Sequence, residues 1–468
     1  MDQPIVFGTD GWRAVIARDF TFENLHRVAH ATARWLGAPP RTVVVGYDAR
    51  FMGESFARFV SHVLSGQGIR VLLADRITPT PAISWATREY GANAGIVITA
   101  SHNPFEYNGY KVKASFGGPA TPDMVAAIER EVVPRSELPA VPDGDPTRIE
   151  RVPIRAQYLD AVHKKSDIQA LQNSGLLIGH DPMFGAGRGA YAELLGSECV
   201  RELHASFDPT FGGLNPEPIP RNLQALKRFV QDNRLAVGIA NDGDADRIGA
   251  VDEEGNMVTA HMILALLLKY LYRDCSQRGA VVKTFATTHL LDKMASAYGL
   301  ASETYPIGFK YIAPRFVNGD VLVGGEESGG IAVAGHIPER DGIYVGLLLI
   351  AMMVHREQKL SVLIRELFDE FGPHAYHRAD LRTTRERTQA VVAFLAREGG
   401  LSRIGGHPVL EVDTLDGHKH LLRDGWLLVR PSGTEPLLRI YAEAPSETTA
   451  RQWVEDVTDQ LGVAGYVR

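Results

Sequence analysis

Three aspartates stand at alternate positions directly after a run of apolar residues. They are Asp242, Asp244 and Asp246 in the segment NDGDADR, which follows LAVGIA. Carboxylates at this spacing repel one another unless a cation lies among them, and a donor set made only of oxygen suits Mg²⁺. The sequence therefore predicts a magnesium site. The alternatives are a solvated acidic turn and an EF-hand loop, and Arg247 argues against the EF-hand because that loop requires glycine there.

A serine closes a second apolar run. Ser101 follows GIVITA and precedes HNPFEYNGYK, in which Asn103-Pro104 and Asn108-Gly109 are turn signals. In open α/β sheets ligands bind where strands end in loops, so Ser101 is a candidate nucleophile. The alternative is an ordinary cap or turn serine, which is the commoner case. His102 and Lys111 could each move a proton if the Asn108-Gly109 turn folds Lys111 back toward Ser101.

Two further loops carry groups that suit a sugar phosphate. VGGEESGG places Glu326, Glu327 and Ser328 among glycines at a strand end, and carboxylates and hydroxyls are good partners for sugar hydroxyls. VRPSGTEPLLRIY combines arginine forks, hydroxyls and a glycine between two strands, as a phosphate-binding nest does. The alternatives are a flexible turn for the first segment and a structural hairpin for the second.

Regular elements must position these loops, and the chain alternates strand and helix patterns through most of its length. Residues 42–101 predict a βαβαβ unit with a parallel sheet, and two similar series follow the Pro-rich connector at 134–148. After Gly372-Pro373, short strands between two helices predict a smaller antiparallel α+β domain. We expect domains at 1–150 (with the Ser101 loop), 151–256 (metal loop), 257–371 (sugar loop) and 372–468 (phosphate loop).

Composition narrows the classes of function. The chain has 468 residues and a net charge of −7, so several domains are expected and a general affinity for nucleic acid is not. Its 2 cysteines, Cys199 and Cys275, have no paired spacing, which fits the reducing cytoplasm. The N-terminus does not look like a signal peptide, and the apolar segments 261–272 and 343–354 are better interpreted as buried helices than as membrane spans.

Two nucleotide-binding motifs are disfavoured. GAGRGA at 185–190 formally matches a dinucleotide fingerprint, but Pro182 to Gly185 already separate its start from the strand that ends at Asp181. No Gly-Lys pair occurs in the chain, which excludes a Walker A loop.

The order of the four chemical loops resembles the α-D-phosphohexomutase superfamily. TASHNP, DGDADR, GEESGG and RPSGTEP follow one another, and FGTDGWR precedes them near the N-terminus. The resemblance covers essentially the whole chain, and four such loops in order are highly specific. It implies a heart-shaped enzyme with three similar α/β domains that have mixed or parallel sheets, a smaller C-terminal α+β domain, and a central cleft where one loop from each domain meets.

The resemblance also implies the chemistry of an intramolecular phosphotransferase (EC 5.4.2). Ser101 would carry a phosphoryl group, give it to a hexose monophosphate, and take the other phosphate back from the hexose 1,6-bisphosphate. One Mg²⁺ would be held by Ser101 and the three aspartates, with Arg13, His102 and Lys111 as catalytic residues beside it. The implied substrate-binding residues are Arg247, Lys310 in PIGFKYI, Glu326, Ser328, Arg430, Ser432, Gly433, Thr434 and Arg439.

The choice of sugar is less constrained. Gly330 stands where several phosphomannomutase and phosphoglucosamine mutase relatives have a histidine, and Trp12 is more typical of phosphoglucomutases. We expect a cytoplasmic phosphoglucomutase, monomer or homodimer, with glucose 1,6-bisphosphate as activator and no nucleic-acid or membrane partner. Mannose phosphate, alone or together with glucose phosphate, is the second alternative, and glucosamine phosphate is the third. A catalytically silent sugar-phosphate-binding protein and a metal-dependent phosphatase are alternatives of another class.

Overall fold

The computed structural model describes residues 5–38, 40–397, 401–431 and 437–463. The chain divides into two compact units, which are described separately here. Unit 1 comprises Met1–Gly279 and Gly308–Leu363, and unit 2 comprises Ala280–Ile307 and Ile364–Arg468. The segment 280–307 was expected in the third domain and groups instead with the C-terminal residues. The four domain boundaries inferred from the sequence stay a prediction.

The first sheet of unit 1 has the strand order β1-β5-β4-β2-β3-β6. β2 pairs in parallel with β3 and β4, and β3 with β6, whereas β5 is antiparallel to β4 and to β1. The strands are β1 (Trp12–Val15), β2 (Thr42–Tyr47), β3 (Arg70–Ala74), β4 (Ala94–Ile98), β5 (Tyr107–Ala114) and β6 (Ile149–Val152). The βαβαβ prediction is therefore confirmed, with antiparallel strands added at one edge.

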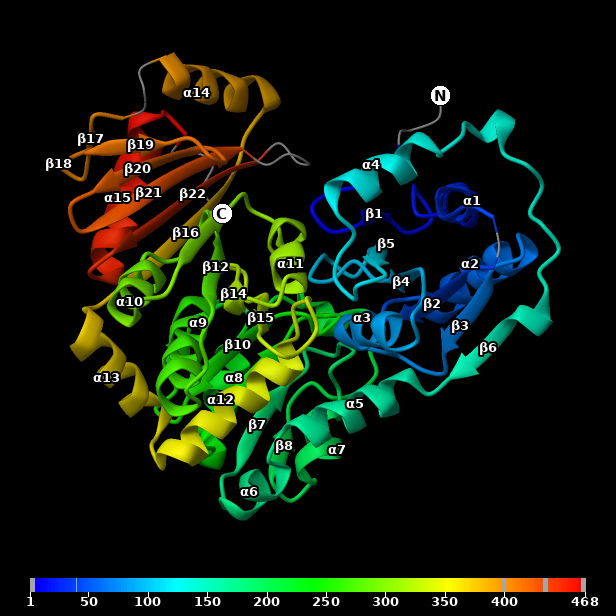
Figure 1. Ribbon diagram of the computed structural model, residues 1–468. Helices are drawn as coiled ribbons and strands as arrows, with labels where there is room; N and C mark the ends of the chain where they lie inside the picture. Colours follow the sequence, from blue (N-terminus) through cyan, green and yellow to red (C-terminus); the bar gives the residue numbers. More distant parts are fainter. Residues whose placement is uncertain (1–4, 39, 398–400, 432–436, 464–468) are drawn as a thin grey trace. The chain divides into compact units, whose positions relative to one another are not determined.

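Helices cover both faces of this sheet (Figure 1). Val43 and Val45 of β2 share a core with α1 and α2, while the next residue on the opposite face, Gly46, lies against Ile83 of α3. This alternation follows from the two-residue period of a strand. The helices are α1 (Phe22–Leu36), α2 (Gly53–Gly66), α3 (Thr80–Glu89) and α4 (Pro122–Arg130).

The second sheet of unit 1 has the order β11-β10-β9-β7-β8 and is also mixed. β7 is parallel to β8 and β9, and β10 returns antiparallel to β9 through the aspartate loop. The strands are β7 (Ile178–Asp181), β8 (Val200–Glu202), β9 (Val237–Asn241), β10 (Ile248–Asp252) and β11 (Met257–Val258). The accompanying helices are α5 (Ile154–Lys165), α6 (Ile168–Asn173), α7 (Ala190–Leu195) and α8 (Gln224–Asn233).

The remaining part of unit 1 contains the two long apolar segments. They form α9 (Ala260–Lys269), which continues as a short π-helix (Tyr270–Asp274), and α12 (Gly342–Arg356), and both helices are largely buried. The other elements are α11 (Phe309–Val317) and the antiparallel pair β14 (Val321–Gly325) and β15 (Ile331–Val333). No helix in the described ranges has the length and apolar character that a bilayer crossing requires.

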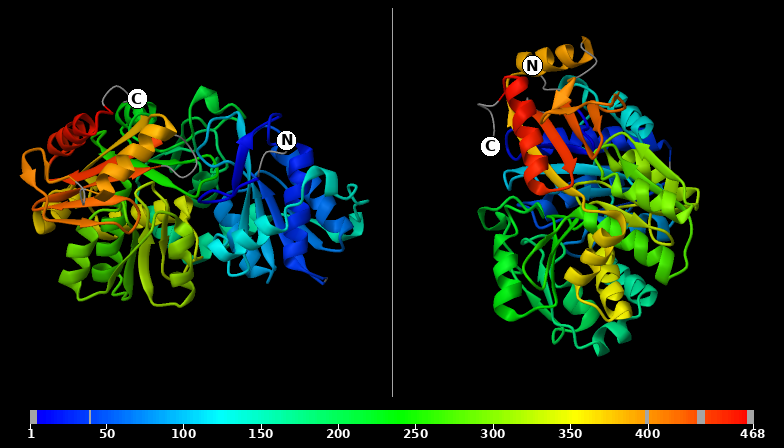
Figure 2. Two further views of the ribbon diagram at one scale, coloured as in Figure 1. Left: turned by 90° about the horizontal axis from the view of Figure 1, so that it is seen from above. Right: turned by 90° about the vertical axis from the view of Figure 1, so that its left-hand side faces the viewer.

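Unit 2 is built on an antiparallel sheet of order β16-β22-β21-β20-β19. Helix α15 packs along one face of this sheet (Figure 2) and buries Trp453 and Val457 against it. The elements are β16 (Ala375–Arg382), α14 (Arg385–Arg397), β17 (Arg403–Ile404), β18 (His407–Pro408), β19 (Glu411–Asp413), β20 (His418–Leu422), β21 (Gly425–Pro431), β22 (Leu437–Ala444) and α15 (Glu447–Gln460). This is the predicted α+β arrangement.

The segment 280–307 adds a parallel strand pair and a helix to unit 2. These elements are β12 (Ala280–Thr284), α10 (Leu290–Tyr298) and β13 (Ser302–Tyr305). Phe285, which directly follows β12, contacts the antiparallel sheet in two ways. Its ring packs with Trp426, and its carbonyl oxygen accepts a hydrogen bond from Lys419 Nζ at 2.9 Å. Helix α13 (Leu360–Phe371) runs across the boundary between the two units.

Candidate active site

The three aspartates occupy the tight connection between β9 and β10. β9 ends at Asn241, and its antiparallel pairing with β10 brings Asn241 opposite Ile248, so six residues must turn the chain. Ala245 adopts a left-handed φ of 59°, which helps to close this turn. As a result one carboxylate oxygen from each of Asp242, Asp244 and Asp246 lies within 4.8 Å of the others, and all three side chains are buried.

This carboxylate group fits a divalent cation. Asp244 Oδ1 and Asp246 Oδ1 are buried and have no hydrogen-bond partner among the described residues. Burial, followed by the charges of Asp246 and Asp244, raises the pKa of Asp242 well above its ordinary value. A bound cation would satisfy the orphaned oxygens and remove this repulsion, and the oxygen-only donor set is the one Mg²⁺ prefers.

Ser101 lies against the same carboxylates. Its Oγ donates a hydrogen bond to Asp242 Oδ2 at 2.7 Å, and His102 Nδ1 is 3.4 Å from the same Oγ. The backbone of Ser101 is held in a left-handed conformation with φ 52°, and its N–H donates to Thr99 Oγ1 at 2.8 Å. A non-glycine residue in this conformation stores strain, which tertiary contacts must offset.

The close approach of the two loops explains a glycine in the metal loop. A Cβ atom on Gly243 would overlap with the carbonyl oxygen of Ser101. The backbone of the aspartate loop can therefore lie directly on the serine loop only because residue 243 has no side chain.

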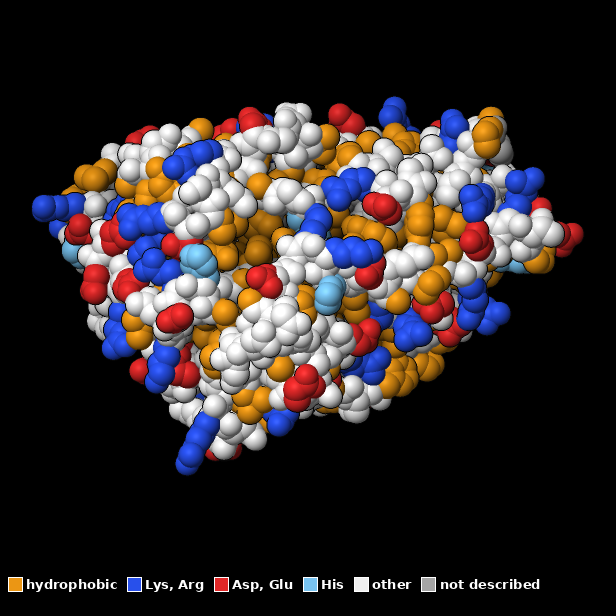
Figure 3. Space-filling view, turned by 60° about the horizontal axis from the view of Figure 1, so that its bottom comes forward, with side chains coloured by type: hydrophobic (Ala, Val, Ile, Leu, Met, Phe, Trp, Pro, Cys, Tyr) orange, Lys and Arg blue, Asp and Glu red, His pale blue; other side chains and the backbone are white. Residues whose placement is uncertain are grey.

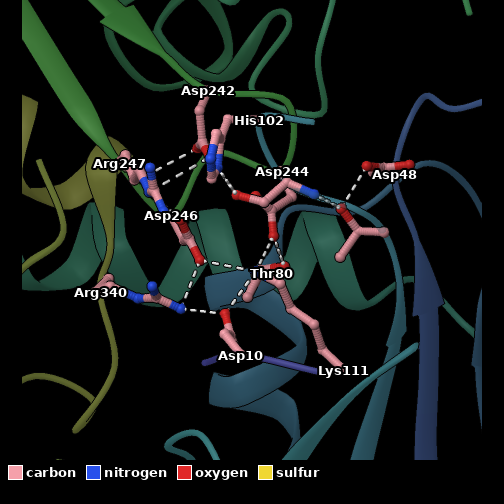
Figure 4. A network of polar contacts seen from close by, with 12 residues as sticks. Asp10, Asp48, Thr80, His102, Lys111, Asp242, Asp244, Asp246, Arg247 and Arg340 are labelled. Atoms are coloured by element: carbon pink, nitrogen blue, oxygen red, sulfur yellow. Dashed lines mark hydrogen bonds and ion pairs between the residues drawn. The ribbon is translucent and has the colours of Figure 1, made fainter. Parts of the chain in front are cut away.

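Lys111 is the central cation of the cluster (Figure 4). Its fully buried Nζ lies 2.8 Å from Asp244 Oδ2, 3.1 Å from Asp246 Oδ2 and 2.8 Å from Asp10 Oδ2. Burial alone would lower the pKa of Lys111, but the three carboxylates outweigh burial and raise it above the ordinary value. Lys111 therefore stays an ammonium ion, which suits it to stabilise negative charge and not to exchange a proton.

The turn predicted at Asn108-Gly109 is wrong, because both residues lie inside strand β5. β5 pairs with β1 on one side and β4 on the other, and a side chain on Gly109 would overlap with the Thr99 carbonyl and crowd the Trp12 carbonyl. Glycine is thus required for close strand packing. Lys111 still reaches the site, because it is carried there by the strand and not by a turn.

The site also contains a buried arginine that the sequence analysis did not identify. Arg340, in the segment PERDG before α12, contacts Asp10 and lies 2.9 Å from Asp246 and 3.5 Å from Glu326. Burial opposes ionisation of Asp10, but Lys111, Lys113 and Arg340 outweigh it and hold the pKa of Asp10 well below its ordinary value.

Two further residues donate hydrogen bonds to the aspartate loop and to the serine loop. Thr80 at the start of α3 donates a hydrogen bond from its hydroxyl to Asp244 Oδ2 at 2.5 Å. Burial would raise the pKa of Asp244, but the contacts with Lys111 and Thr80 outweigh burial and hold this pKa below its ordinary value. Arg50 donates from Nη2 to the carbonyl oxygens of Ser101 and Asn103, at 2.6 Å in each case. Arg50 therefore fixes the backbone of the serine loop.

The sugar loop contributes Glu326 to the same cluster. β14 ends at Gly325, and burial raises the pKa of Glu326 to about 7, although Arg340 opposes this shift. Ser328 is half-buried in the following turn. The loop contacts the metal loop through the backbone, since Ile248 N–H donates to the Gly329 carbonyl at 3.0 Å.

The other basic candidates also lie near the cluster. Arg247 Nε is 4.0 Å from Asp242 Oδ2 and 3.9 Å from Asp246 Oδ1. Arg13 Nη1 donates to Asn103 Oδ1 at 2.6 Å, next to the serine loop. Lys310 is half-buried on α11, where burial lowers its pKa and Asp10 opposes the shift.

The phosphate loop belongs to unit 2 and is described only at its ends. Arg430 and Arg439 face each other across β21 and β22, with Arg430 Nε 2.9 Å from Asp416 Oδ1. Ser432, Gly433 and Thr434 lie outside the described residues. Unit 1 thus brings together three of the four predicted loops, and the approach of the fourth loop stays a prediction.

Comparisons with known proteins decide the family. Profiles for phosphoglucomutase/phosphomannomutase match the chain in order: α/β/α domain I at 4–137, domain II at 156–255, domain III at 259–371 and the C-terminal domain at 381–460. The chain belongs to the phosphoglucomutase/phosphomannomutase family. It is a phosphohexomutase, and the predicted fold class of three α/β domains and a smaller C-terminal domain is confirmed.

Relatives of this phosphohexomutase carry more than one substrate name. The phosphoglucomutase/phosphomannomutase of Thermococcus kodakarensis is 32% identical over 96% of this chain and 97% of its own. A phosphoglucosamine mutase of Carboxydothermus hydrogenoformans is 30% identical over 97% and 98% of the two chains. The solved structure of a putative phosphomannomutase from Thermus thermophilus superposes with a TM-score of 0.87 at 38% identity, covering 99% of this chain and 100% of that one.

Proposed function

We propose that this phosphohexomutase interconverts glucose 1-phosphate and glucose 6-phosphate through a phosphorylated Ser101 and a bound hexose 1,6-bisphosphate. The observation that carries the proposal is the 2.7 Å hydrogen bond from Ser101 Oγ to Asp242, one of three buried carboxylates that fit a cation. Phosphoryl transfer needs positioning and charge neutralisation more than covalent help from the protein. A buried alcohol among carboxylates, a cation site and basic side chains meets both needs.

The proposed metal ligands are Asp242, Asp244, Asp246 and the phosphorylated Ser101 side chain. The two orphaned carboxylate oxygens and the mutual repulsion at Asp242 support this assignment. Mg²⁺ at this site would neutralise charge on the transferring phosphoryl oxygens. Arg13 and Arg247 would add fixed positive charge next to Ser101 and the aspartates.

The reaction consists of two phosphoryl transfers of opposite direction. In the first, the bond between phosphorus and Ser101 Oγ breaks, a bond from phosphorus to the free sugar hydroxyl oxygen forms, and the hydroxyl proton leaves to a base. In the second, Ser101 Oγ attacks the other phosphate, its own proton leaves, and the released sugar oxygen receives a proton. His102, 3.4 Å from Ser101 Oγ, is the proposed proton carrier. The ammonium of Lys111 holds its proton tightly and would supply positive charge to the site.

The remaining predicted residues are proposed to hold the substrate. Glu326 and Ser328 at the end of β14 would accept and donate hydrogen bonds to sugar hydroxyls, and Lys310 would contact the sugar phosphate. The phosphate that does not react would be held by the hairpin residues Arg430, Ser432, Gly433 and Thr434, with Arg439 on the second strand of the hairpin. The bisphosphate must reverse its orientation between the two transfers, so this clamp has to accept either phosphate.

A coupled assay tests the activity. Purified protein is given glucose 1-phosphate, Mg²⁺ and a trace of glucose 1,6-bisphosphate, and glucose 6-phosphate is measured together with inorganic phosphate. We expect glucose 6-phosphate as the main product. Persistent absence of glucose 6-phosphate would indicate a silent binding protein, and inorganic phosphate as the main product would indicate a phosphatase. Mannose 1-phosphate is the second substrate to test, because Glu326 and Ser328 are expected to contact hydroxyls that both sugars share.

The proposed setting is the cytoplasm, with a small sugar phosphate as substrate, glucose 1,6-bisphosphate as activator, and a monomer or homodimer as the working form. No nucleic-acid or membrane partner is proposed, and basic and acidic side chains are interspersed over the face shown in Figure 3. The two cysteines, Cys199 and Cys275, are free in the described structure, which agrees with a reducing compartment.

A further inference from the structure

Asp48 is joined to the amide side of Ser101 through one hydroxyl group. Strands β2 and β4 run in parallel, and their last residues, Tyr47 and Ile98, are partners in the sheet. The residues that follow, Asp48 and Thr99, therefore lie side by side at the same edge. Asp48 Oδ2 accepts a hydrogen bond from Thr99 Oγ1 at 2.5 Å, and Thr99 Oγ1 accepts one from the Ser101 N–H at 2.8 Å. The N–H of Ser101 is thus tied to the end of β2.

The same aspartate is joined to the carbonyl side of Ser101 through Arg50. The Nη1 and Nη2 atoms of Arg50 donate hydrogen bonds to four carbonyl oxygens of the serine loop. These belong to Ser101 (2.6 Å), Asn103 (2.6 Å), Pro104 (2.8 Å) and Tyr107 (2.9 Å). Arg50 Nε lies 3.3 Å from Asp48 Oδ2, and both side chains are fully buried. One ion pair therefore anchors the loop from residue 101 to residue 107.

The two ties hold Ser101 in a conformation that it would not keep alone. Its φ is 52°, in the left-handed region that residues with a side chain disfavour. The Ser101 N–H and carbonyl belong to the two peptide groups on either side of its Cα, so fixing both also fixes the direction of the Cα–Cβ bond. This direction brings Oγ to 2.7 Å from Asp242 Oδ2. Without the ties, we expect the backbone to relax and Oγ to move away from the carboxylates.

A phenylalanine that follows the second sheet's strand β8 covers the ion pair. Phe211 is fully buried, and the Arg50 guanidinium lies 4.9 Å from the centroid of its ring. An aromatic face attracts a guanidinium, and ion pairs and hydrogen bonds are stronger where water is excluded. The anchor of the serine loop is therefore well suited to hold one fixed geometry.

We propose that Asp48 and Arg50 are positioning residues of the phosphoryl transfers, which hold Ser101 Oγ in line with the sugar phosphate through Thr99 and the loop carbonyls. The inference rests on the proposed mutase function. Ser101 Oγ is the leaving group in one transfer and the nucleophile in the other, so it must return to the same place in every cycle. A displacement of about 1 Å can cost about 10²-fold in rate. Neither residue is proposed to touch the substrate, so both act through Ser101.

Three variants test the tie on the amide side. Thr99→Val deletes the linking hydroxyl, and Asp48→Asn replaces one of the two acceptor oxygens with a donor amide. We expect each to lower kcat about 10²-fold while KM for glucose 1-phosphate stays within about threefold, because the substrate contacts are unchanged. Thr99→Ser keeps the hydroxyl and should keep kcat within about threefold of the wild type. Rapid mixing with labelled glucose 1,6-bisphosphate should show the same losses in the rate at which Ser101 is phosphorylated.

Arg50→Lys tests the tie on the carbonyl side. Lysine keeps the positive charge but carries its three donors on one atom, so it cannot serve four carbonyl oxygens that are spread along the loop. We expect a loss in kcat of at least about 10²-fold. Wild-type turnover in Arg50→Lys would show that these hydrogen bonds do not position Ser101.

Matched controls separate positioning from stability. Thr32→Val removes the hydroxyl of another fully buried threonine, which bonds with Tyr110 and the α1 backbone. Arg27→Lys changes another buried arginine, which binds the Val133 carbonyl. Both controls should lower the thermal midpoint and leave kcat unchanged. Turnover is expressed per Mn²⁺ bound, measured by electron paramagnetic resonance, so that an unfolded fraction does not count as lost activity.

The outcomes distinguish this inference from the proposed function. If the wild type neither takes up phosphate on Ser101 nor converts a hexose phosphate, the mutase proposal fails. If the wild type is active and Thr99→Val and Asp48→Asn match its kcat, the mutase proposal stands and the positioning role is overturned. A lower thermal midpoint with unchanged kcat overturns it in the same way, because the contacts then serve stability alone. A lower kcat with unchanged KM, recovered in Thr99→Ser, supports the inference.

Discussion

Ser101 Oγ and Asp242 Oδ2 are 2.7 Å apart, although 141 residues separate them along the chain. The contact joins the end of β4 in the first sheet of unit 1 to the end of β9 in the second sheet. Gly243 permits it, because the backbone there lies directly against the Ser101 carbonyl. The proposed nucleophile and the proposed metal site are therefore parts of one structure.

Ser101→Ala should abolish mutase turnover while leaving the binding of hexose monophosphate largely intact. The substitution removes the oxygen that carries the phosphoryl group but none of the proposed sugar or phosphate contacts. We expect a loss of at least about 10³-fold in kcat, as for removal of a covalent nucleophile. The measurements are the coupled assay and calorimetric titration with glucose 6-phosphate. Ser136→Ala, at an exposed serine, is the control, and clear flux in purified Ser101→Ala would refute the role of Ser101.

Removal of divalent metal should stop turnover, and Mg²⁺ should restore it. The expectation follows from the three buried carboxylates of the 242–246 loop and their two orphaned oxygens. Asp246→Asn should weaken metal affinity by at least about tenfold, because it removes a charged ligand and even the loss of a ligand's outer hydrogen-bond partner typically costs about 10- to 100-fold. Titration with Mn²⁺ followed by electron paramagnetic resonance measures affinity without relying on activity. Full activity in excess chelator would exclude a required metal.

Lys111→Met should destabilise the protein and lower turnover. The variant leaves Asp10, Asp244 and Asp246 buried without their shared cation, a defect that typically costs about 3–5 kcal/mol. Mg²⁺ should recover part of the lost stability, because it supplies the missing positive charge. The check is the thermal midpoint with and without Mg²⁺, and the control is Lys164→Met, whose side chain is 72% exposed. An equal response of both variants to Mg²⁺ would contradict the assignment.

Lys419 should make the stability of unit 2 rise with pH above neutrality. Burial, and then the charge of Lys283, lowers the pKa of Lys419 to about 7, although its Nζ lies 4.0 Å from the Trp426 ring centroid. Between about pH 7 and the ordinary value of 10.5 the unfolded chain binds a proton that the folded protein does not, so folding becomes more favourable as pH rises. Below about pH 7 both states are protonated and this contribution is constant.

The test is to measure the thermal midpoints of wild type and Lys419→Met between pH 6.5 and 9.5 by tryptophan fluorescence. It shows whether stability rises with pH, as expected. The thermal midpoint of the wild type should rise relative to that of Lys419→Met as the pH increases. The midpoint of Lys359→Met, which changes an exposed lysine, should follow the same pH dependence as that of the wild type. Parallel curves for Lys419→Met would show that Lys419 keeps an ordinary pKa.

The sequence by itself determined the chemical loops and the class of fold. Asp242, Asp244 and Asp246 could be identified because alternating carboxylates after an apolar run are a local pattern, and Ser101 because its loop ends another such run. The buried helices at 260–269 and 342–356 were predictable for the same reason, since their apolar character spans more than two turns.

Only the tertiary structure decided which distant residues complete the site. Thr80 and Arg340 were not identified, because nothing in their local sequence shows that they converge on a carboxylate group far away in the chain. Asp10 lies in the segment FGTDGWR, which was noted, but its role there was not. Asn108-Gly109 was expected to turn and instead lies in β5, because β1 and β4 offer backbone partners on both sides. Local propensity describes what a segment favours alone, whereas burial and pairing with remote segments determine its final conformation and the charge its side chains carry.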